Sequence, residues 1–425
     1  MTNVHTVTIV LDDQAKNYTP SFQTEERYAR SWKAVLKNAY KFGIVKCACR
    51  GTGAKRLAIK YFAGSDSFSL ARFGGSAGEH AADCRFSSDD DSDRGTDKAA
   101  AGVIDIQRDG NVRIRLEIGL KIRDVAPDRK TTVEGKPRSG GRSQAAIGLS
   151  GLLGYLWDHA TLNRWQPYWA GKRNQYTTFR RLHTSAGTIT AGDVTLVDQL
   201  LLPAATAEDA DANRNRGRVR AAIVEKRRLL IIAPMASHTL ERAERAKREL
   251  TISGFHGIPR VFMAEGQWDR IGKRFPLVAS GWARGHQTVV IAQIEVRERQ
   301  GRLSANLVDA ALMSVTAQWI PVESSYEREI ANRLVTAGRA FYKPMRYSQD
   351  ESEVLPDFVL LDCERGEVPM EVFGRSDDAY LARKREKAAY YDRTYGETGW
   401  WRWDATVPGA LENIPAFPPA ARPTA

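Results

Sequence analysis

The stretch Leu355–Lys387 constrains the fold of this chain more than any other part of its sequence. Asp357 opens an apolar run, a polar turn with Gly366 follows, and a second apolar run contains Glu371. This pattern predicts a β-hairpin. If the turn centres on Glu364, Asp357 and Glu371 are each seven residues from the centre and lie directly opposite each other. Directly opposed residues share one face of a sheet, so the two carboxylates should be neighbours.

Two neighbouring carboxylates predict a cation site. Like charges at that range are costly unless a cation lies between them. Carboxylates on rigid strands provide the oxygen ligands that Mg²⁺ takes. We therefore expect Asp357 and Glu371 to bind Mg²⁺ or Mn²⁺.

The helix expected after the hairpin adds lysines to this site. Tyr380, Lys384, Lys387 and Tyr391 recur at i, i+4, i+7 and i+11, so they share one helix face. A lysine beside a metal-bound water stabilises the charge that develops in a phosphoryl transition state. Lys387 or Lys384 is expected to orient or activate the attacking water, and the pattern does not decide between them.

These residues resemble the PD-(D/E)xK nuclease superfamily. Pro356-Asp357 matches its first half-motif and Glu371 the acid of its second, but Phe373 stands where the superfamily usually has its lysine. In some members that lysine moves to the following helix, as Lys384 or Lys387 would do here. The resemblance covers about the last quarter of the chain and implies Mg²⁺-dependent hydrolysis of phosphodiester bonds.

The predicted element order fits this resemblance. A helix is expected at Ser324–Ala337, a strand at Phe341–Tyr347, and another strand at Trp400–Trp403 after the lysine-bearing helix. Helix, three strands, helix and strand give a restriction-endonuclease-like αβββαβ domain over 321–407. Glu327, beside the apolar stripe of the first helix, is a further candidate metal ligand. The alternative is a small α/β domain whose acids are solvated and whose lysines form a surface stripe.

A second candidate metal site lies near the N-terminus. Cys47 and Cys49 form one close pair, and His80 and Cys84 are spaced by one helical turn. Two thiolates plus a Cys/His pair make the tetrahedral ligand set that suits structural Zn²⁺. The layout resembles a treble-clef or SWIM-like zinc module, although SWIM modules end in Cys-x-His. Three buried cysteines and an unrelated histidine are the alternative.

Composition indicates the class of partner and compartment. Lys and Arg outnumber Asp and Glu by 63 to 51, and the net charge of +12 favours a polyanion such as nucleic acid, DNA in particular. The N-terminus does not have the pattern of a signal peptide, and no apolar run is long enough to span a bilayer. Because only 4 Cys occur and three are clustered, we expect a reduced, cytoplasmic protein with a metal site.

A basic and aromatic region follows a predicted helix at Ala146–Leu162. Interleaved basic and aromatic side chains grip phosphates and stack bases, although arginines extending outward from an aromatic core give the same pattern. The candidate nucleic-acid-binding residues are Lys172, Arg173, Arg180, Arg181, Arg383 and Lys384.

The sequence predicts a mixed, multidomain α/β protein. The expected parts are a zinc-binding module (1–98), a β-hairpin plus helical basic-aromatic region (99–205), a β-α-β region (206–320), the nuclease-like domain (321–407) and a weakly ordered Pro/Ala-rich tail (408–425). The hairpin is expected at Val103–Arg123, a polar loop at Glu208–Arg220, and strands at Arg228–Ala233, Pro259–Met263, Leu277–Gly281 and Gln287–Arg297, with a helix at His238–Thr251.

The chain as a whole also resembles an uncharacterised bacterial family carried on plasmids and integrative elements. The resemblance rests on Cys47-x-Cys49 and on the stretches GEHAADC, LLGYLWDHATLNRW and PDFVLL…PMEVFG…YLARKREK. It implies a mobile-element context with protein partners from such an element. The expected function is therefore a Mg²⁺-dependent DNA nuclease of mobile elements. The alternative is a catalytically inactive nuclease fold that binds DNA or acts as an adaptor in plasmid transfer or maintenance.

Overall fold

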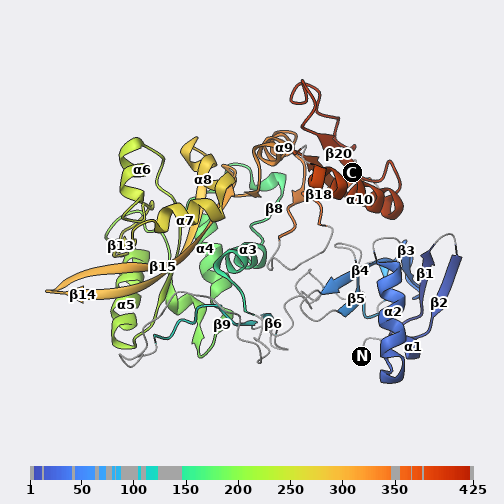
Figure 1. Cartoon of the computed structure of the whole chain (residues 1–425), viewed down its shortest axis with the longest axis horizontal. Helices are drawn as coiled ribbons and strands as arrows, with labels where there is room; N and C mark the ends of the chain where they lie inside the picture. Colours follow the sequence, from blue (N-terminus) through green and yellow to red (C-terminus); the bar gives the residue numbers. More distant parts are fainter. Residues whose placement is uncertain are drawn as a thin grey trace. The chain divides into compact units, whose positions relative to one another are not determined.

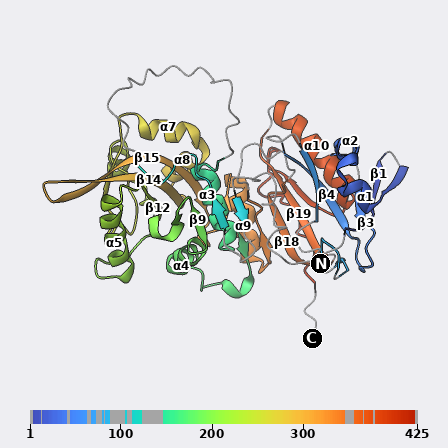
Figure 2. The same cartoon turned by 90° about the horizontal axis from the view of Figure 1, so that it is seen from below.

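The computed structural model of the chain describes residues 4–11, 14–40, 44–62, 67–72, 79–81, 83–87, 104–106, 112–122, 146–345, 355–364, 366–375 and 378–421. The chain divides into two compact units (Figures 1 and 2). One unit combines Met1–Ala99, Arg164–Pro167 and Arg333–Ala425, and the other combines Ala100–Asn163 and Tyr168–Asn332. The expected mixed α/β class is confirmed, since helices and several sheets alternate along the chain.

The N-terminal part of the first unit is a five-stranded sheet in the order β2-β1-β3-β4-β5. Helix α2 buries Leu36 in the same core as Val7 and Val45. The elements are β1 (Val7–Leu11), β2 (Gln14–Tyr18), α1 (Pro20–Thr24), α2 (Ala29–Ala39), β3 (Ile44–Cys47), β4 (Arg56–Phe62) and β5 (Ser67–Arg72).

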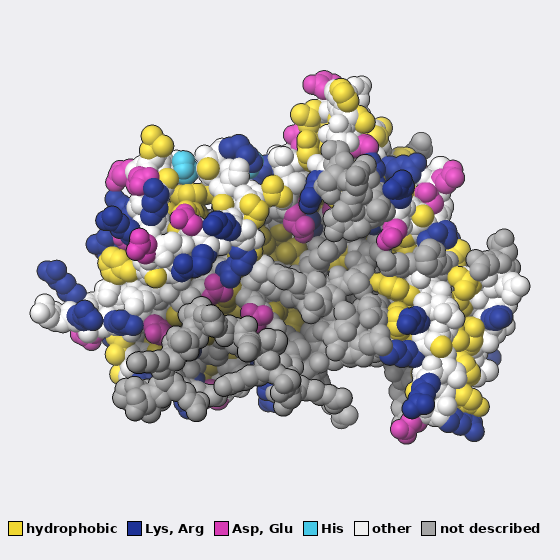
Figure 3. All heavy atoms as spheres, viewed as in Figure 1, with side chains coloured by type: hydrophobic (Ala, Val, Ile, Leu, Met, Phe, Trp, Pro, Cys, Tyr) yellow, Lys and Arg dark blue, Asp and Glu magenta, His cyan; other side chains and the backbone are white. Residues whose placement is uncertain are grey.

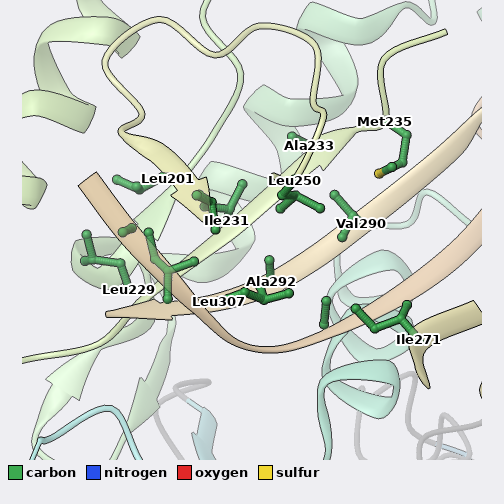
Figure 4. Packing of buried hydrophobic residues seen from close by; sticks show 14 of the residues in the cluster. Leu201, Leu229, Ile231, Ala233, Met235, Leu250, Ile271, Val290, Ala292 and Leu307 are labelled. Atoms are coloured by element: carbon green, nitrogen blue, oxygen red, sulfur yellow. The ribbon is translucent and has the colours of Figure 1, made fainter. Parts of the chain in front are cut away.

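The second unit is built on a six-stranded sheet in the order β11-β12-β14-β15-β13, with β16 pairing β15. Every residue of β12 is buried, and its side chains meet those of β14 in a hydrophobic core (Figure 4). The strands are β11 (Leu200–Leu201), β12 (Leu229–Pro234), β13 (Arg260–Phe262), β14 (Thr288–Arg299), β15 (Arg302–Val315) and β16 (Pro321–Val322). The helices beside them are α5 (Ala210–Val224), α6 (Leu240–Ala246), α7 (Gln267–Arg274) and α8 (Pro276–Ala283).

The predicted helix Ala146–Leu162 is α3 (Leu149–His159), which packs against α4 (Gln175–Ala186). Trp157 of α3 is fully buried, and its indole N–H donates to the Trp319 carbonyl at 3.0 Å. A four-stranded sheet in the order β10-β9-β7-β6 completes this unit. Its strands are β6 (Ile104–Ile106), β7 (Val112–Ile114), β9 (Ile189–Ala191) and β10 (Val194–Thr195).

The C-terminal sheet of the first unit has the order β20-β19-β18-β17-β8. Its elements and the preceding helix are β8 (Arg164–Trp165), α9 (Ser325–Thr336), β17 (Phe341–Tyr342), β18 (Phe358–Cys363), β19 (Gly366–Phe373), α10 (Asp378–Tyr395) and β20 (Trp401–Asp404). The expected αβββαβ order is therefore present from α9 to β20. Strands β17, β18 and β19 are antiparallel, and β20 runs parallel to β19.

Two assignments in the second unit are wrong. The predicted strand Leu277–Gly281 is helical, because Pro276 starts α8 and a short apolar run does not distinguish a helix from a strand. The predicted loop Glu208–Arg220 is mostly α5. Although its composition is polar, α5 has a buried side. This side includes Asn215, whose amide donates to the Leu202 carbonyl at 2.8 Å.

The expected hairpin at Val103–Arg123 is only partly present. Strands β6 and β7 pair, but β7 ends at Ile114, although the apolar alternation continues to Ile122. Beyond that strand the backbone makes isolated bridges, including one from Leu116 to Ile147. Alternation alone therefore overestimated the length of the strand.

The tail is not weakly ordered over its described residues 408–421. The indole N–H of Trp401 donates to the Pro415 and Ala416 carbonyls at 3.3 and 3.1 Å. Near its end, the Ala421 backbone N–H donates to the Asp362 carbonyl at 2.7 Å. Proline and alanine content predicted disorder, but sheet residues bind the tail backbone. No helix among the described residues is both long and apolar enough to cross a bilayer.

Candidate functional site

The hairpin of β18 and β19 has the predicted register. Phe358 pairs with Met370, and Asp357 and Glu371 are the residues next to this pair, close enough for the Asp357 charge to act on Glu371. The Asp357 backbone N–H donates to the Met370 carbonyl at 2.9 Å, and its carboxylate accepts from the Val372 N–H at 2.7 Å. The register shifts between Leu360 and Cys363, so this irregularity lies at the turn and not at the end of the hairpin that holds the two acids.

Glu371 is almost completely buried, with 2% of its surface exposed. Two residues of α10, one helical turn apart, reach its carboxylate. The Lys387 ammonium lies 2.8 Å from Oε2 and 2.7 Å from Oε1, and the Tyr391 hydroxyl donates to Oε1 at 2.8 Å. The helix face predicted from the sequence therefore does turn toward the hairpin and brings Lys387 to the acid.

The position of Glu371 perturbs its ionisation. Burial raises the pKa of Glu371, and the Asp357 carboxylate raises it further, while Lys387 and Tyr391 lower it, which leaves a pKa of about 8. Burial disfavours the charged form of a carboxyl group, and a nearby like charge adds to that cost. A buried acid beside a second carboxylate is a place where a cation is electrostatically favoured.

The two candidate lysines have different partners. Lys384 donates to the Asp404 carboxylate at the end of β20, and its ammonium lies 4.8 Å from the ring centre of Phe373. Only Lys387, of the two, contacts Glu371. Phe373, in the usual place of the superfamily's lysine, is buried at 3% exposure.

Tyr391 and Asp404 were not predicted as site residues. Tyr391 was recognisable as a member of the lysine-bearing helix face, but its hydrogen bond to Glu371 depends on how α10 docks. Asp404 pairs in register with Phe373 across the parallel strands β19 and β20. That neighbour relationship crosses an intervening helix, and no local pattern in the sequence encodes it.

The other candidate ligand and basic residues are spread over the chain. Glu327 is buried in α9, within the second unit, and its carboxylate accepts from the Glu323 N–H at 3.0 Å. Arg383 lies in α10, and its side chain is outside the described residues. The roles of these two residues stay predictions.

The candidate residues of the basic-aromatic region differ in how exposed they are. Lys172, Arg180 and Arg181 are exposed. The Arg173 guanidinium donates to the Leu162 carbonyl, and both Arg173 and Arg181 lie within 5.5 Å of the Trp169 ring centre. Burial lowers the pKa of Arg173 to about 9, and the charge of Arg181 lowers it as well. Arg173 therefore packs inside the region, while the other three side chains face outward.

The four predicted zinc ligands form one buried cluster. Their ligand atoms all lie within 4.8 Å of one another. The Cys47 and Cys84 sulfurs are 3.7 Å apart, and Nδ1 of His80 is 3.5 Å from the Cys49 sulfur and 3.7 Å from that of Cys84. Tetrahedral zinc, with Zn–S of about 2.3 Å and Zn–N of about 2.0–2.1 Å, spaces two sulfurs about 3.8 Å apart and sulfur from nitrogen about 3.6 Å. The three distances given above thus match those of a zinc tetrahedron.

Local contacts bring the two halves of this cluster together. The Lys55 ammonium donates to the carbonyls of Cys49 and Gly51 at 3.0 and 2.8 Å, while the Lys55 N–H donates to the Glu79 carboxylate at 2.7 Å. A Cβ on Gly51 would lie 2.0 Å from the Glu79 carbonyl oxygen. Only glycine allows the two backbones to approach this closely beside His80.

Burial also affects the thiols. It raises the pKa of Cys84 to about 12 and raises that of Cys47. Burial raises the pKa of Cys49 too, but the backbone N–H groups of Ala81 and Gly51 lower it by more. Burial thus disfavours the thiolate forms of Cys47 and Cys84, and a bound dication would reverse that preference.

Comparison with known proteins identifies a family. Residues 21–406 match the family model described as Protein of unknown function (DUF1173). No curated protein and no solved structure matches the chain. The expected resemblance to an uncharacterised family over most of the chain is therefore confirmed, and these comparisons give no support to the nuclease superfamily.

Proposed function

The chain belongs to the DUF1173 family, whose function is unknown, and we propose from its own residues that it is a Mg²⁺-dependent nuclease acting on DNA. We further propose that it serves a mobile genetic element, where proteins of that element are its partners. The observation that supports the nuclease activity best is the buried Glu371, which feels the charge of Asp357 and is bonded to Lys387.

The donor set of this site fits a hard dication. Asp357 and Glu371 offer only carboxylate oxygens, which Mg²⁺ and Mn²⁺ prefer over nitrogen or sulfur ligands. Their mutual repulsion, visible in the raised pKa of Glu371, would be relieved by such an ion. When bound, the metal would supply a water of lowered pKa and polarise a phosphoryl oxygen.

The chain's own residues would divide the remaining work. Asp357 and Glu371 would hold the ion on adjacent strands, so that its position is fixed by the sheet. Tyr391 donates to Oε1 of Glu371 and fixes the orientation of that carboxylate. The Lys387 ammonium, 2.8 Å from Glu371, is the group placed to orient the attacking water and to stabilise the developing negative charge. Lys384, bonded to Asp404, would position α10 against β20.

A cleavage assay tests the proposal. Plasmid and single-stranded DNA are incubated with wild type, Asp357→Ala or Glu371→Ala in Mg²⁺ or Mn²⁺. Glu364→Ala is the matched control, because it removes an exposed acid from the same hairpin. We expect cleavage by wild type and the control and none by the other two variants. Cleavage by Asp357→Ala at the wild-type rate, in protein with native circular dichroism, would show that the site is assigned wrongly.

A second function has its own supporting observation. Both oxygens of Glu371 already have protein partners, and Phe373 is buried where the superfamily has a lysine. These contacts favour a nuclease-like fold retained as a DNA-binding or adaptor module in plasmid transfer or maintenance. That module would retain DNA in a gel shift, cleave none, and take up no Mn²⁺ through Asp357 and Glu371.

We also propose that Cys47, Cys49, His80 and Cys84 bind a structural Zn²⁺. The support is the 3.5–3.7 Å spacing of their ligand atoms and their burial. Four protein ligands complete a tetrahedron, so no position is open for substrate. Metal analysis of the purified protein should find one zinc per chain, lost in Cys84→Ser. Equal zinc content in wild type and Cys84→Ser would contradict this assignment.

A further inference from the structure

The β14–β15 hairpin extends beyond the sheet that it helps to form. The first seven residues of β14 are buried, whereas Arg297 and the residues after it are exposed. Figures 1 and 2 both show the outer end of this hairpin projecting from its own unit as a two-stranded ribbon. Gln300 and Gly301, with φ of 50° and 71°, form the tight turn at the tip. We call 295–306 the arm; its base is flanked by β13, which pairs with Ser304, Ala305 and Asn306, and its outer part has two strands.

Arginines gather on one face of the arm. Arg299 pairs directly with Arg302, and Arg297 pairs with Ser304, so the three arginines share a face. Figure 3 shows Lys and Arg side chains at the end of this hairpin, on the far left of the view. Like charges directly opposite each other destabilise a sheet. The pairing of Arg299 with Arg302 is therefore unfavourable for folding, and a ligand that carries negative charge would relieve it.

This positive charge is not neutralised within the described part of the chain. Glu295, on the same face, is bonded to Arg228 at 2.8 Å, and Glu298 lies on the opposite face. None of the three arginines forms an ion pair with a described carboxylate. The Arg297 guanidinium faces the amide of Asn306 at 3.2 Å, a neutral partner, so the charges of all three arginines remain available to an anionic partner.

We propose that the arm binds duplex DNA, with Arg297, Arg299 and Arg302 contacting backbone phosphates along a groove. A two-stranded β-ribbon fits the major groove of B-form DNA, which is about 12 Å wide. The major groove of duplex RNA is too narrow for side chains to enter. No Phe, Trp or Tyr occurs from Thr288 to Val315, so the hairpin lacks the stacking residues that single-stranded nucleic acid requires.

The arm belongs to the second unit, and its binding does not depend on the Asp357–Glu371 site. Duplex binding by the arm can hold even if the chain cleaves nothing. Phosphate contacts carry no sequence information, so the arm should bind duplexes of different sequence with similar affinity.

The test is fluorescence anisotropy with the full chain and a duplex of about 25 base pairs, in buffer without added Mg²⁺ and without a chelator, so that the zinc cluster is undisturbed. The same strand alone and an RNA duplex of equal length are the competing probes. The arm variant is Arg297→Ala/Arg299→Ala/Arg302→Ala. The control variant Arg242→Ala/Arg245→Ala/Lys247→Ala removes three positive charges from α6 and its C-cap, where Glu241 and Glu244 already pair with two of them.

We expect the arm variant to bind the DNA duplex at least about tenfold more weakly. The slope of log affinity against log salt concentration should become less negative by about 3, since each lost phosphate contact contributes about 0.9. The control should bind as wild type does. Equal duplex affinity and salt dependence in the arm variant and wild type would overturn the proposal. A loss confined to the single strand or to RNA would overturn it as well.

Arg302→Glu separates folding from binding. It places opposite charges across the strands at Arg299, so the hairpin should be as stable as in wild type or more stable. Its duplex affinity should nevertheless fall by more than that of Arg302→Ala, because a negative charge faces the phosphates. Unchanged duplex affinity in Arg302→Glu, with the melting temperature preserved, would count against the arm.

Discussion

Replacing Glu371 by Gln should abolish a pH dependence of stability that this one buried acid causes. The pKa of Glu371 is raised from 4.5 to about 8, first by burial and then by Asp357. Between these values the folded protein keeps a proton on Glu371 that the unfolded chain has released. The free energy of unfolding therefore falls as the pH rises, and the stabilisation is fully present only below pH 4.5.

The size of the effect follows from the same two values. At 1.36 kcal/mol for each pKa unit, the complete loss is about 5 kcal/mol, and roughly half of it falls between about pH 6 and pH 8.5. Because Glu371 is 2% exposed, screening by solvent reduces this free energy only slightly. Gln cannot titrate, and it adds only a constant offset from the altered contact with Lys387.

Amide hydrogen exchange of β19 peptides is the suitable assay, because the two units need not unfold together. Comparing wild type with Glu371→Gln at each pH cancels the intrinsic pH dependence of exchange. Protection of β19 in wild type should fall relative to the variant as the pH rises, and Mn²⁺ should restore it at the higher pH. A difference that stays constant between about pH 6 and pH 8.5 would refute the reasoning.

Three further predictions concern single residues. Gly51→Ala should lose zinc, measured by metal analysis, because its Cβ would lie 2.0 Å from the Glu79 carbonyl oxygen. Lys387→Met should slow cleavage by about 10²-fold in single-turnover kinetics and Lys384→Met by much less, because only Lys387 contacts the acid pair. Arg339→Met should lower the free energy of unfolding, measured by urea denaturation, by about 3 kcal/mol, because it leaves the Asp362 carboxylate of β18 without its guanidinium partner. A wild-type zinc content in Gly51→Ala would contradict the first prediction, and equal cleavage rates for the two lysine variants would contradict the second. An unchanged urea midpoint in Arg339→Met would contradict the third.

The acid pair was predictable because local geometry determines it. A hairpin centred near Glu364 fixes which residues face each other, so Asp357 and Glu371 could be paired by position alone. A helix likewise fixes which residues share a face, so Lys387 and Tyr391 could be grouped. The spacing of the ligand residues in the sequence likewise allowed the Cys/His cluster to be predicted.

The features that were missed depend on contacts between distant segments. Leu277–Gly281 lies in α8, which packs against β14 and β15, although its apolar residues suit a strand equally well. The full length of β15 and the docking of the tail on Trp401 have no local signal. Which lysine meets Glu371 was also open, since it depends on how α10 lies against the sheet and on the partner that Asp404 provides for Lys384.

Binding of Mn²⁺ tests the central claim most directly, namely that Asp357 and Glu371 form a divalent metal site. Titration is followed by electron paramagnetic resonance, comparing zinc-loaded wild type with Asp357→Asn/Glu371→Gln. The account predicts that wild type binds one Mn²⁺ more per chain than the double variant, and that the zinc content of the two proteins is equal. Equal Mn²⁺ binding by both proteins would contradict the account.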